Sequence, residues 1–112
     1  MSELVCNILE KSGATVVTLS GQITFAEATD LSRHLARAIA DNPRRLVLDL
    51  SGVTVITSAG IGALLKLHQD VSKWDCQLWL VGLRPGVAEI ISGSRLDQVL
   101  DIAASLDDAL SD

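Results

Sequence analysis

Residues 46–62 read LVLDLSGVTVITSAGIG, and this stretch decides the fold. Its first part, residues 46–50, is almost continuously apolar, which is typical of a β-strand buried on both faces. Ser51-Gly52 predicts a turn, and residues 53–56 form a short apolar approach to a second turn at Thr57. Apolar positions spaced by three and four follow, which predicts an amphipathic helix with this buried stripe: Ile61, Leu64, Leu65, His68 and Val71.

The same alternation of strand and helix extends toward the N-terminus. Residues 4–9 and 14–19 predict two strands joined as a hairpin by Ser12-Gly13, and Gly21 is expected to end the second strand. A helix is expected over residues 26–40, because its apolar positions recur at helical spacing until Asn42-Pro43 stops it.

Toward the C-terminus the pattern predicts four further elements. They are a buried strand at residues 77–81, a helix from Pro85 to Ser92-Gly93, a short strand at 99–102 and a terminal helix at 103–110. Alternation of this kind in a short chain predicts an α/β fold. We expect one domain over residues 1–112, with a mixed, mostly parallel sheet of four to five strands packed by about four helices.

Composition argues against several classes of partner. Fourteen acidic and nine basic residues give a net charge of -5, which disfavours nucleic acid and anionic membrane surfaces. The sequence shows no secretory signal and no apolar run near the ~20 residues of a membrane span, so a cytoplasmic protein without membrane insertion is expected. Cys6 and Cys76 lie far apart in strand-like stretches, which favours buried reduced thiols over a disulfide.

The turn Thr57-Ser58-Ala59-Gly60 supports two interpretations, and both place a hydroxyl group at the N-terminus of the following helix. In the first, the hydroxyl of Thr57 or Ser58 caps the following helix by accepting hydrogen bonds from its free N–H groups. In the second, Ser58 is a site of reversible phosphorylation, because a helix N-terminus tolerates phosphate well. The modification would add a charge of about −1.5 to −2, which would oppose docking of a partner on this surface.

No catalytic constellation emerges from the sequence. Asp49, His34 and Ser58 have the residue types of a triad, but Ile56 stands where a nucleophile elbow requires glycine. Asp49 lies in an apolar strand, and it either orients the Ser58 turn or caps a loop amide. His68 has no second ligand at metal-binding spacing, so we expect no metal site.

The two glycines after the turn do not form a nucleotide-binding motif. Gly60 and Gly62 match the first two glycines of a dinucleotide fingerprint, but Leu65 occupies the position of the third small residue. A close approach of the chain to its neighbours explains these glycines better. The sequence therefore predicts a protein-binding module with no cofactor and no enzymatic activity.

Four segments carry a resemblance to a known family. They are residues 17–23 (VTLSGQI), 46–53 (LVLDLSGV), 56–65 (ITSAGIGALL) and 80–87 (LVGLRPGV). Laid end to end they resemble the STAS domain of bacterial anti-sigma factor antagonists and of the cytoplasmic tails of sulfate transporters. Residues 56–65 are similar to the family's Asp-Ser-Ser-Gly loop and the helix that follows it.

The resemblance implies a partner-switching function. In the antagonists the serine directly after the loop's aspartate is phosphorylated, and that position is Ser58 here. The unphosphorylated protein would bind an anti-sigma factor with serine kinase activity, phosphorylation would release it, and a metal-dependent serine phosphatase would reset it. The implied partner-binding residues are Thr57, Ser58, Ala59, Gly60, Ile61 and Gly62.

Two residues depart from the family's loop. Thr57 replaces the aspartate and Ala59 replaces the second serine, which makes Thr57 a rival phosphate acceptor to Ser58. An altered loop also suits an alternative function. The chain would then be a constitutive STAS subunit of a larger assembly, such as a lipid-transport ABC permease or a stress-signalling complex, without a phosphorylation switch.

Overall fold

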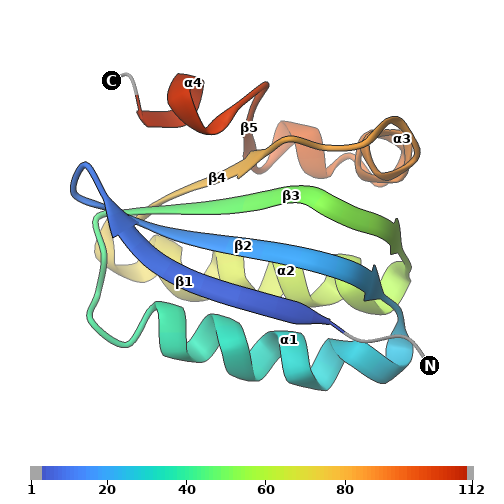
Figure 1. Ribbon diagram of the computed structural model, residues 1–112, viewed down its shortest axis with the longest axis horizontal. Coiled ribbons are helices and arrows are strands. Elements are labelled where there is room, and N and C mark those ends of the chain that lie inside the picture. The colour runs from blue at the N-terminus through green and yellow to red at the C-terminus, as the bar shows by residue number, and fades with distance from the viewer. Residues whose placement is uncertain (1–3, 111–112) are drawn as a thin grey trace.

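Strands and helices alternate around one sheet in the computed structural model, which describes residues 4–110 (Figure 1). The sheet has the order β1-β2-β3-β4-β5, in which β1 is antiparallel to β2 and the other neighbours are parallel. The strands are β1 (Val5–Lys11), β2 (Ala14–Ile23), β3 (Arg45–Ile56), β4 (Gln77–Val81) and β5 (Asp101–Ala103). The helices are α1 (Phe25–Ala38), α2 (Ser58–Val71), α3 (Pro85–Gly93) and α4 (Leu106–Leu110). The predicted fold class is confirmed.

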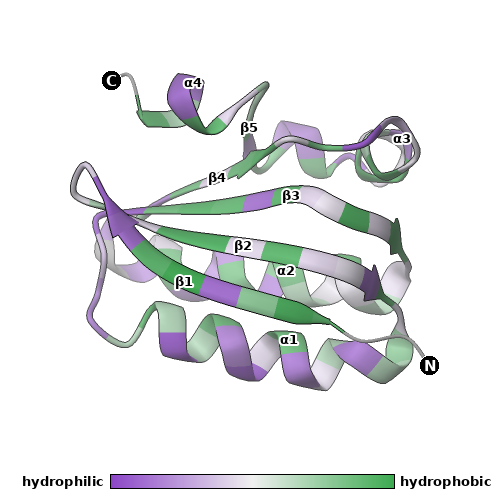
Figure 2. Cartoon of the chain, viewed as in Figure 1, coloured by the Kyte–Doolittle hydropathy of each residue, from purple (hydrophilic) through white to green (hydrophobic). Residues whose placement is uncertain are grey.

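The main core lies between the sheet and helices α1 and α2, which cover one of its faces (Figure 1). Leu46, Leu48 and Leu50 of β3 are fully buried in it, and Val87 and Ile91 of α3 join the same cluster. Apolar residues follow the central strands, whereas the outer side of α1 is largely polar (Figure 2). This pattern is the amphipathic arrangement that the spacing of apolar residues predicts.

A second, smaller cluster lies on the opposite face of the sheet. There α4 packs Ala109 against a few strand residues, among them Val16 and Val47. Arg45 donates a hydrogen bond from Nη1 to the carbonyl oxygen of Ala109 at 3.2 Å. Within residues 4–110 the indole Nε1 of Trp79 is a buried donor that has no acceptor. This cover is therefore thin compared with the main core.

Two predicted strand ends are wrong. Strand β2 continues past Gly21 to Ile23, and β3 runs without a break through the predicted turn at Ser51-Gly52. The pairing of β2 with β3 shifts register twice in this region, which is the signature of β-bulges. A Cβ on Gly52 would lie 2.5 Å from the Cβ of Ser20, so this glycine serves close approach of two strands and not a turn.

The predicted strand at 77–81 and the helix from Pro85 to Gly93 are confirmed, whereas the last strand and the last helix both start later and are shorter than predicted. Residues 96–98 form the 3₁₀ turn η2 (Leu96–Gln98), and a second such turn, η1 (Ser72–Trp74), follows α2. Leu96 and Leu100 are buried in the main core, so the apolar run near residue 99 anchors a loop and β5 starts only at Asp101. Cys6 and Cys76 are free thiols, as expected, although Cys6 is only half-buried. Burial raises the pKa of both thiols, and Arg37 partly opposes this for Cys6.

The close approach at Gly52 makes a testable prediction. Gly52→Ala should lower the free energy of unfolding by about 1–3 kcal/mol, because the added methyl meets the neighbouring strand. Gly86→Ala in α3 is the matched control, since a Cβ there meets no atom within 4 Å. Urea denaturation of both variants checks this, and equal stabilities would contradict the packing of β2 against β3.

Candidate functional site

The turn at Thr57 lies at the carboxyl end of β3, directly beside the end of β2. Ile23 pairs with Ile56 at the end of the ladder, and the N–H of Thr57 donates to the carbonyl oxygen of Ile23 at 3.0 Å. Helices α1 and α2 therefore begin at the same edge of the sheet (Figure 1). In open α/β folds this edge, beyond the carboxyl ends of the strands, is where binding sites form.

In the described part of the chain no side-chain cap is present at the N-terminus of α2. Thr57 is the N-cap residue, but its hydroxyl donates to the carbonyl oxygen of Ile23 at 3.4 Å and makes no cap hydrogen bond. The predicted capping by Thr57 or Ser58 is therefore wrong, because the Thr57 side chain is directed at β2. The helical ladder starts with the N–H of Ile61 donating to the carbonyl oxygen of Thr57. Earlier N–H groups in the helix have no intrahelical acceptor.

Helix α1 shows the opposite arrangement a short distance away. Its N-cap residue Thr24 forms a capping box with Glu27, whose Oε1 accepts the N–H of Thr24 at 2.9 Å and also the Thr24 hydroxyl. The carboxylate thus offsets the positive end of the α1 dipole. The first turn of α2 contains no acidic residue. The N-terminus of α2 is therefore the one of the two that has no built-in negative charge.

The predicted partner-binding residues differ in exposure. Ser58, the first residue of α2, is exposed, and so is Gly62. Thr57, Ala59 and Ile61 are half-buried, whereas Gly60 is buried. The hydroxyl of Ser58 is thus the more accessible of the two candidate phosphate acceptors, because the hydroxyl of Thr57 is bonded to β2.

Gly60 and Gly62 serve different purposes. A Cβ on Gly60 would lie 2.6 Å from Cγ2 of Ile23 and 2.8 Å from Cγ1 of Ile56, so only glycine lets α2 start this close to the sheet. A Cβ on Gly62 would meet nothing within 4 Å. Glycine at position 62 costs about 0.5–1 kcal/mol relative to alanine inside a helix. The packing of the described residues does not explain that cost.

Sequence reasoning missed an apolar contribution to this edge. Phe25 is the first residue of α1, and its side chain is 86% exposed. Val55, near the end of β3, is exposed as well. The signal in the sequence was a bulky aromatic at the start of a helix in a chain that has only three aromatic residues. Aromatic side chains are enriched among the residues that dominate protein-binding surfaces, so this exposed ring is a candidate anchor at the edge where α1 and α2 begin.

The other singled-out polar residues do not join the Ser58 turn. Oδ1 of Asp49 accepts the N–H of Ser51 at 3.0 Å, so of the two alternatives it caps a backbone amide. Nε of Arg84 donates to the carbonyl oxygen of Ser51 at 2.8 Å, which fixes the turn into α3. His34 contacts Arg37 on α1. Among residues 4–110 no group of three or more His, Cys, Asp or Glu could hold a metal ion.

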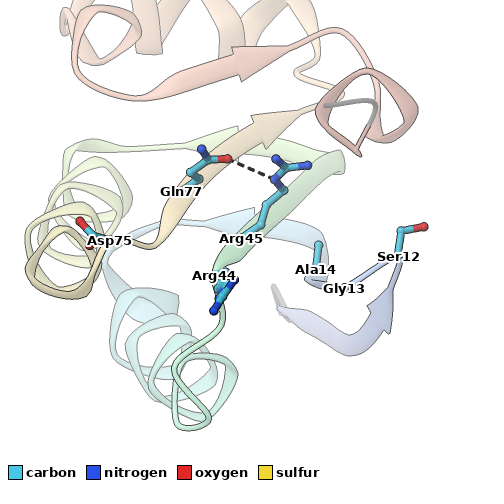
Figure 3. Close-up of a pocket in the computed structure, with 7 residues that line it drawn as sticks. All are labelled: Ser12, Gly13, Ala14, Arg44, Arg45, Asp75 and Gln77. Carbon is cyan, nitrogen blue, oxygen red and sulfur yellow. Dashed lines mark hydrogen bonds between the residues drawn. The ribbon is translucent and has the colours of Figure 1, made fainter.

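A polar hollow of about 700 Å³ lies at the other end of the sheet, around the β1–β2 hairpin (Figure 3). Arg45 is one of its lining residues, and Nε of Arg45 donates to Oε1 of Gln77 at 3.2 Å. The lining residues are Ser12, Gly13, Ala14, Arg44, Arg45, Asp75 and Gln77. This hollow is therefore separate from the edge that carries Ser58.

Comparison with known proteins places the chain in a family. Residues 6–109 match the model of the STAS domain. The chain belongs to the STAS domain family. No helix in the described part of this STAS protein has both the length and the apolar character to span a membrane.

Several relatives of this STAS chain have known names. Osmosensory protein A of Mycobacterium tuberculosis is 36% identical over 105 residues, which cover 88% of this chain and 64% of that protein. The anti-sigma-F factor antagonist RsfB of the same species is 25% identical over 96% of this chain and 88% of its own length. An anti-sigma factor antagonist from Mycobacterium paratuberculosis has a similar crystal structure, with a TM-score of 0.91 and 28% identity over 97% of this chain and 92% of that one.

Alanine at Gly60 and alanine at Gly62 are expected to change the stability of the protein in opposite directions. Gly60→Ala should lower the free energy of unfolding by about 1–3 kcal/mol, because its methyl meets Ile23 and Ile56. Gly62→Ala should raise it by about 0.5–1 kcal/mol, because the helix gains propensity without a clash. Thermal or urea unfolding checks both. A Gly60→Ala protein as stable as the wild type would contradict the packing of α2 on the sheet.

Proposed function

We propose that this protein is an anti-sigma factor antagonist whose binding is switched by phosphorylation of Ser58. The observation that carries the proposal is the exposed Ser58 at the N-terminus of α2, where no side chain caps the helix and the first turn contains no acidic residue. The names of RsfB and of the Mycobacterium paratuberculosis structure support the role of antagonist. The proposed partners are an anti-sigma factor with serine kinase activity and a metal-dependent serine phosphatase.

The local electrostatics favour a phosphate on Ser58. The kinase would transfer the γ-phosphoryl group of ATP to Oγ of Ser58, releasing ADP and the hydroxyl proton. The product would carry a charge of about −1.5 to −2 next to helix N–H groups that have no side-chain cap. Thr57 contributes no competing negative charge. Hydrolysis by the phosphatase would return the serine hydroxyl and inorganic phosphate.

The same phosphate would oppose binding. We propose that the partner docks on the edge formed by Ser58, Gly62 and Phe25, with the ring of Phe25 as an apolar anchor. The bare helix surface at Gly62 admits close approach of the partner's chain, which explains a glycine that the fold does not require. A dianion at Ser58 would have to be desolvated in that interface, and this lowers affinity.

A second candidate function is supported by the altered loop. Thr57 and Ala59 stand where the family resemblance leads one to expect aspartate and serine, and the Thr57 hydroxyl is committed to Ile23. This arrangement fits a constitutive STAS subunit of a larger assembly, such as a lipid-transport ABC permease or a stress-signalling complex. Such a subunit would bind its partners without a phosphorylation switch.

Phosphorylation itself separates the two functions. Incubation with the cognate anti-sigma factor kinase and ATP should add one phosphate, and mass spectrometry of peptides should place it on Ser58. Ser58→Ala should abolish the modification, whereas Thr57→Ala should retain it, because the Thr57 hydroxyl is half-buried and bonded to β2. No phosphate on the wild type would leave the constitutive subunit as the better function.

The switch predicts unequal affinities for variants of one residue. Ser58→Asp should weaken binding to the anti-sigma factor by about tenfold or more, equivalent to about 1.4 kcal/mol. Ser58→Ala should bind as tightly as the unmodified protein and resist release by ATP. Calorimetric titration measures both, and equal dissociation constants would argue against a switch.

Phe25 should act as an anchor for the partner. Phe25→Ala should weaken binding by about 10- to 100-fold, or about 2 kcal/mol, as expected for an exposed aromatic hot spot. Its unfolding free energy should stay within about 0.5 kcal/mol of wild type, because the ring is almost fully exposed. Ile90→Ala, an exposed apolar position on α3, is the control and should bind normally. Equal binding by both variants would remove Phe25 from the interface.

A further inference from the structure

Strand β1 leaves an apolar edge of the sheet unpaired within the described residues. It forms one end of the strand order, and its seven residues pair with β2 in continuous register without a bulge. Three of its side chains, Val5, Ile8 and Leu9, are large, apolar and exposed. Most of the strand is hydrophobic, with polar residues at its centre and at its C-terminal end (Figure 2).

Within residues 4–110 this edge has little of the usual protection against pairing with another strand. Natural proteins protect sheet edges by short strands, charged side chains, proline, bulges or a covering helix or loop. The opposite edge follows this rule, since β5 has only three residues. Strand β1 contains no proline, and its charged residues, Glu10 and Lys11, lie together at its C-terminal end. A long, regular and apolar edge of this kind favours association with an extended strand.

Both faces of β1 carry apolar residues, which restricts the strand that fits beside it. Cys6 and Ile8 lie opposite Leu19 and Val17, so they point toward the main core. Val5 and Leu9 alternate with them and point to the other face. An adjoining strand must therefore present apolar residues on both of its faces, and β1 itself has this property.

We propose that β1 pairs antiparallel with β1 of a second copy of this chain, in a register centred on Asn7. In this register Val5 of one copy lies opposite Leu9 of the other, and Cys6 lies opposite Ile8, so that apolar residues meet on both faces. Glu10 and Lys11 of the two copies fall at opposite ends of the pairing, so they lie far from Glu10 and Lys11 of the other copy. A register centred on Ile8 is disfavoured, because it sets Glu10 against the half-buried Cys6.

The charges flanking the edge are compatible with this twofold symmetry. Helix α1 runs along the β1 side of the molecule (Figure 1), and in its outer row Asp30 pairs with Arg33 of the same helix, with Arg37 one turn further on. A twofold axis perpendicular to the sheet sets the two α1 helices antiparallel on one face of a ten-stranded sheet, which follows from two copies of the five strands.

The pairing leaves the Ser58 turn uncovered, because that turn follows β3 and β2 lies between β3 and β1. The dimer would therefore present two such turns, and it does not depend on the function proposed for them. A single strand pair buries little surface, so the dimer belongs to the weak class of interfaces, below about 1,200 Å² in total.

Sedimentation velocity over about 10 µM to 1 mM protein tests the association, a range that brackets weak dimers. The wild type should shift from monomer to dimer with concentration. The double variant Val5→Lys/Leu9→Lys should stay monomeric, because it places charges on the edge. Val99→Lys is the matched control, since Val99 and Val5 are both 48% exposed, and it should dimerise normally. A monomeric wild type, or a lysine double variant that still dimerises, would overturn the proposal.

Disulfide trapping tests the register. Asn7→Cys in a Cys6→Ser background should form a covalent dimer on mild oxidation, because paired residues of antiparallel strands have Cα atoms about 4.5–5.5 Å apart, within disulfide range. Leu9→Cys in the same background should not form a covalent dimer. In the proposed register residue 9 lies opposite residue 5 of the other copy, about four residues away from residue 9 of that copy. Circular dichroism confirms that both variants are folded. Trapping at position 9 and not at position 7 would overturn the register.

Discussion

The carbonyl oxygen of Ile23 is the contact on which the functional edge depends. It accepts the N–H of Thr57 and also its hydroxyl, so the end of β2 holds the start of α2 in place. Gly60 completes the arrangement, because its missing side chain lets the helix lie against Ile23 and Ile56. The position of Ser58 follows from these contacts. A rigid sheet edge thus presents a serine on the first turn of a helix, where its neighbours neither bury it nor cap the helix.

Much of the fold could be predicted because hydrophobic periodicity reports burial directly. The run in β3 and the apolar spacing in α2 predicted a buried strand and a covering helix, and the structure has both, although Gly60 and Leu67 are buried where Ile61, Leu65 and His68 were expected. The β-bulges could not be predicted in this way. A Ser-Gly pair in the sequence is compatible both with a turn and with close approach of two strands, and at Gly52 the structure has the second. The short strand β5 was predicted at the wrong residues because buried apolar residues also occur outside strands. Leu96 and Leu100 lie in the main core although neither belongs to a strand.

The position of the candidate site in the chain could be predicted, but the hydrogen bonds around it could not. A hydroxyl before a helix predicted a cap, yet the Thr57 hydroxyl bonds β2 and leaves the helix end uncapped. The contrast with the Thr24–Glu27 capping box depends on which residues begin each helix, and sequence boundaries are too coarse to show it. Phe25 escaped notice because an aromatic residue is expected in a core, whereas here it begins a helix and faces solvent.

The thin cover on the second face of the sheet has a consequence for how the molecule opens. Helix α4 is five residues long and rests on a small cluster that also leaves the buried Trp79 indole nitrogen without an acceptor among the described residues. An unpaired buried donor costs about 1–3 kcal/mol, which weakens this layer further. We therefore expect the described C-terminal residues from β5 to α4 to open separately from the rest of the molecule. Their backbone amides should exchange with deuterium through local opening, while those of β2 and β3 should exchange only through global unfolding.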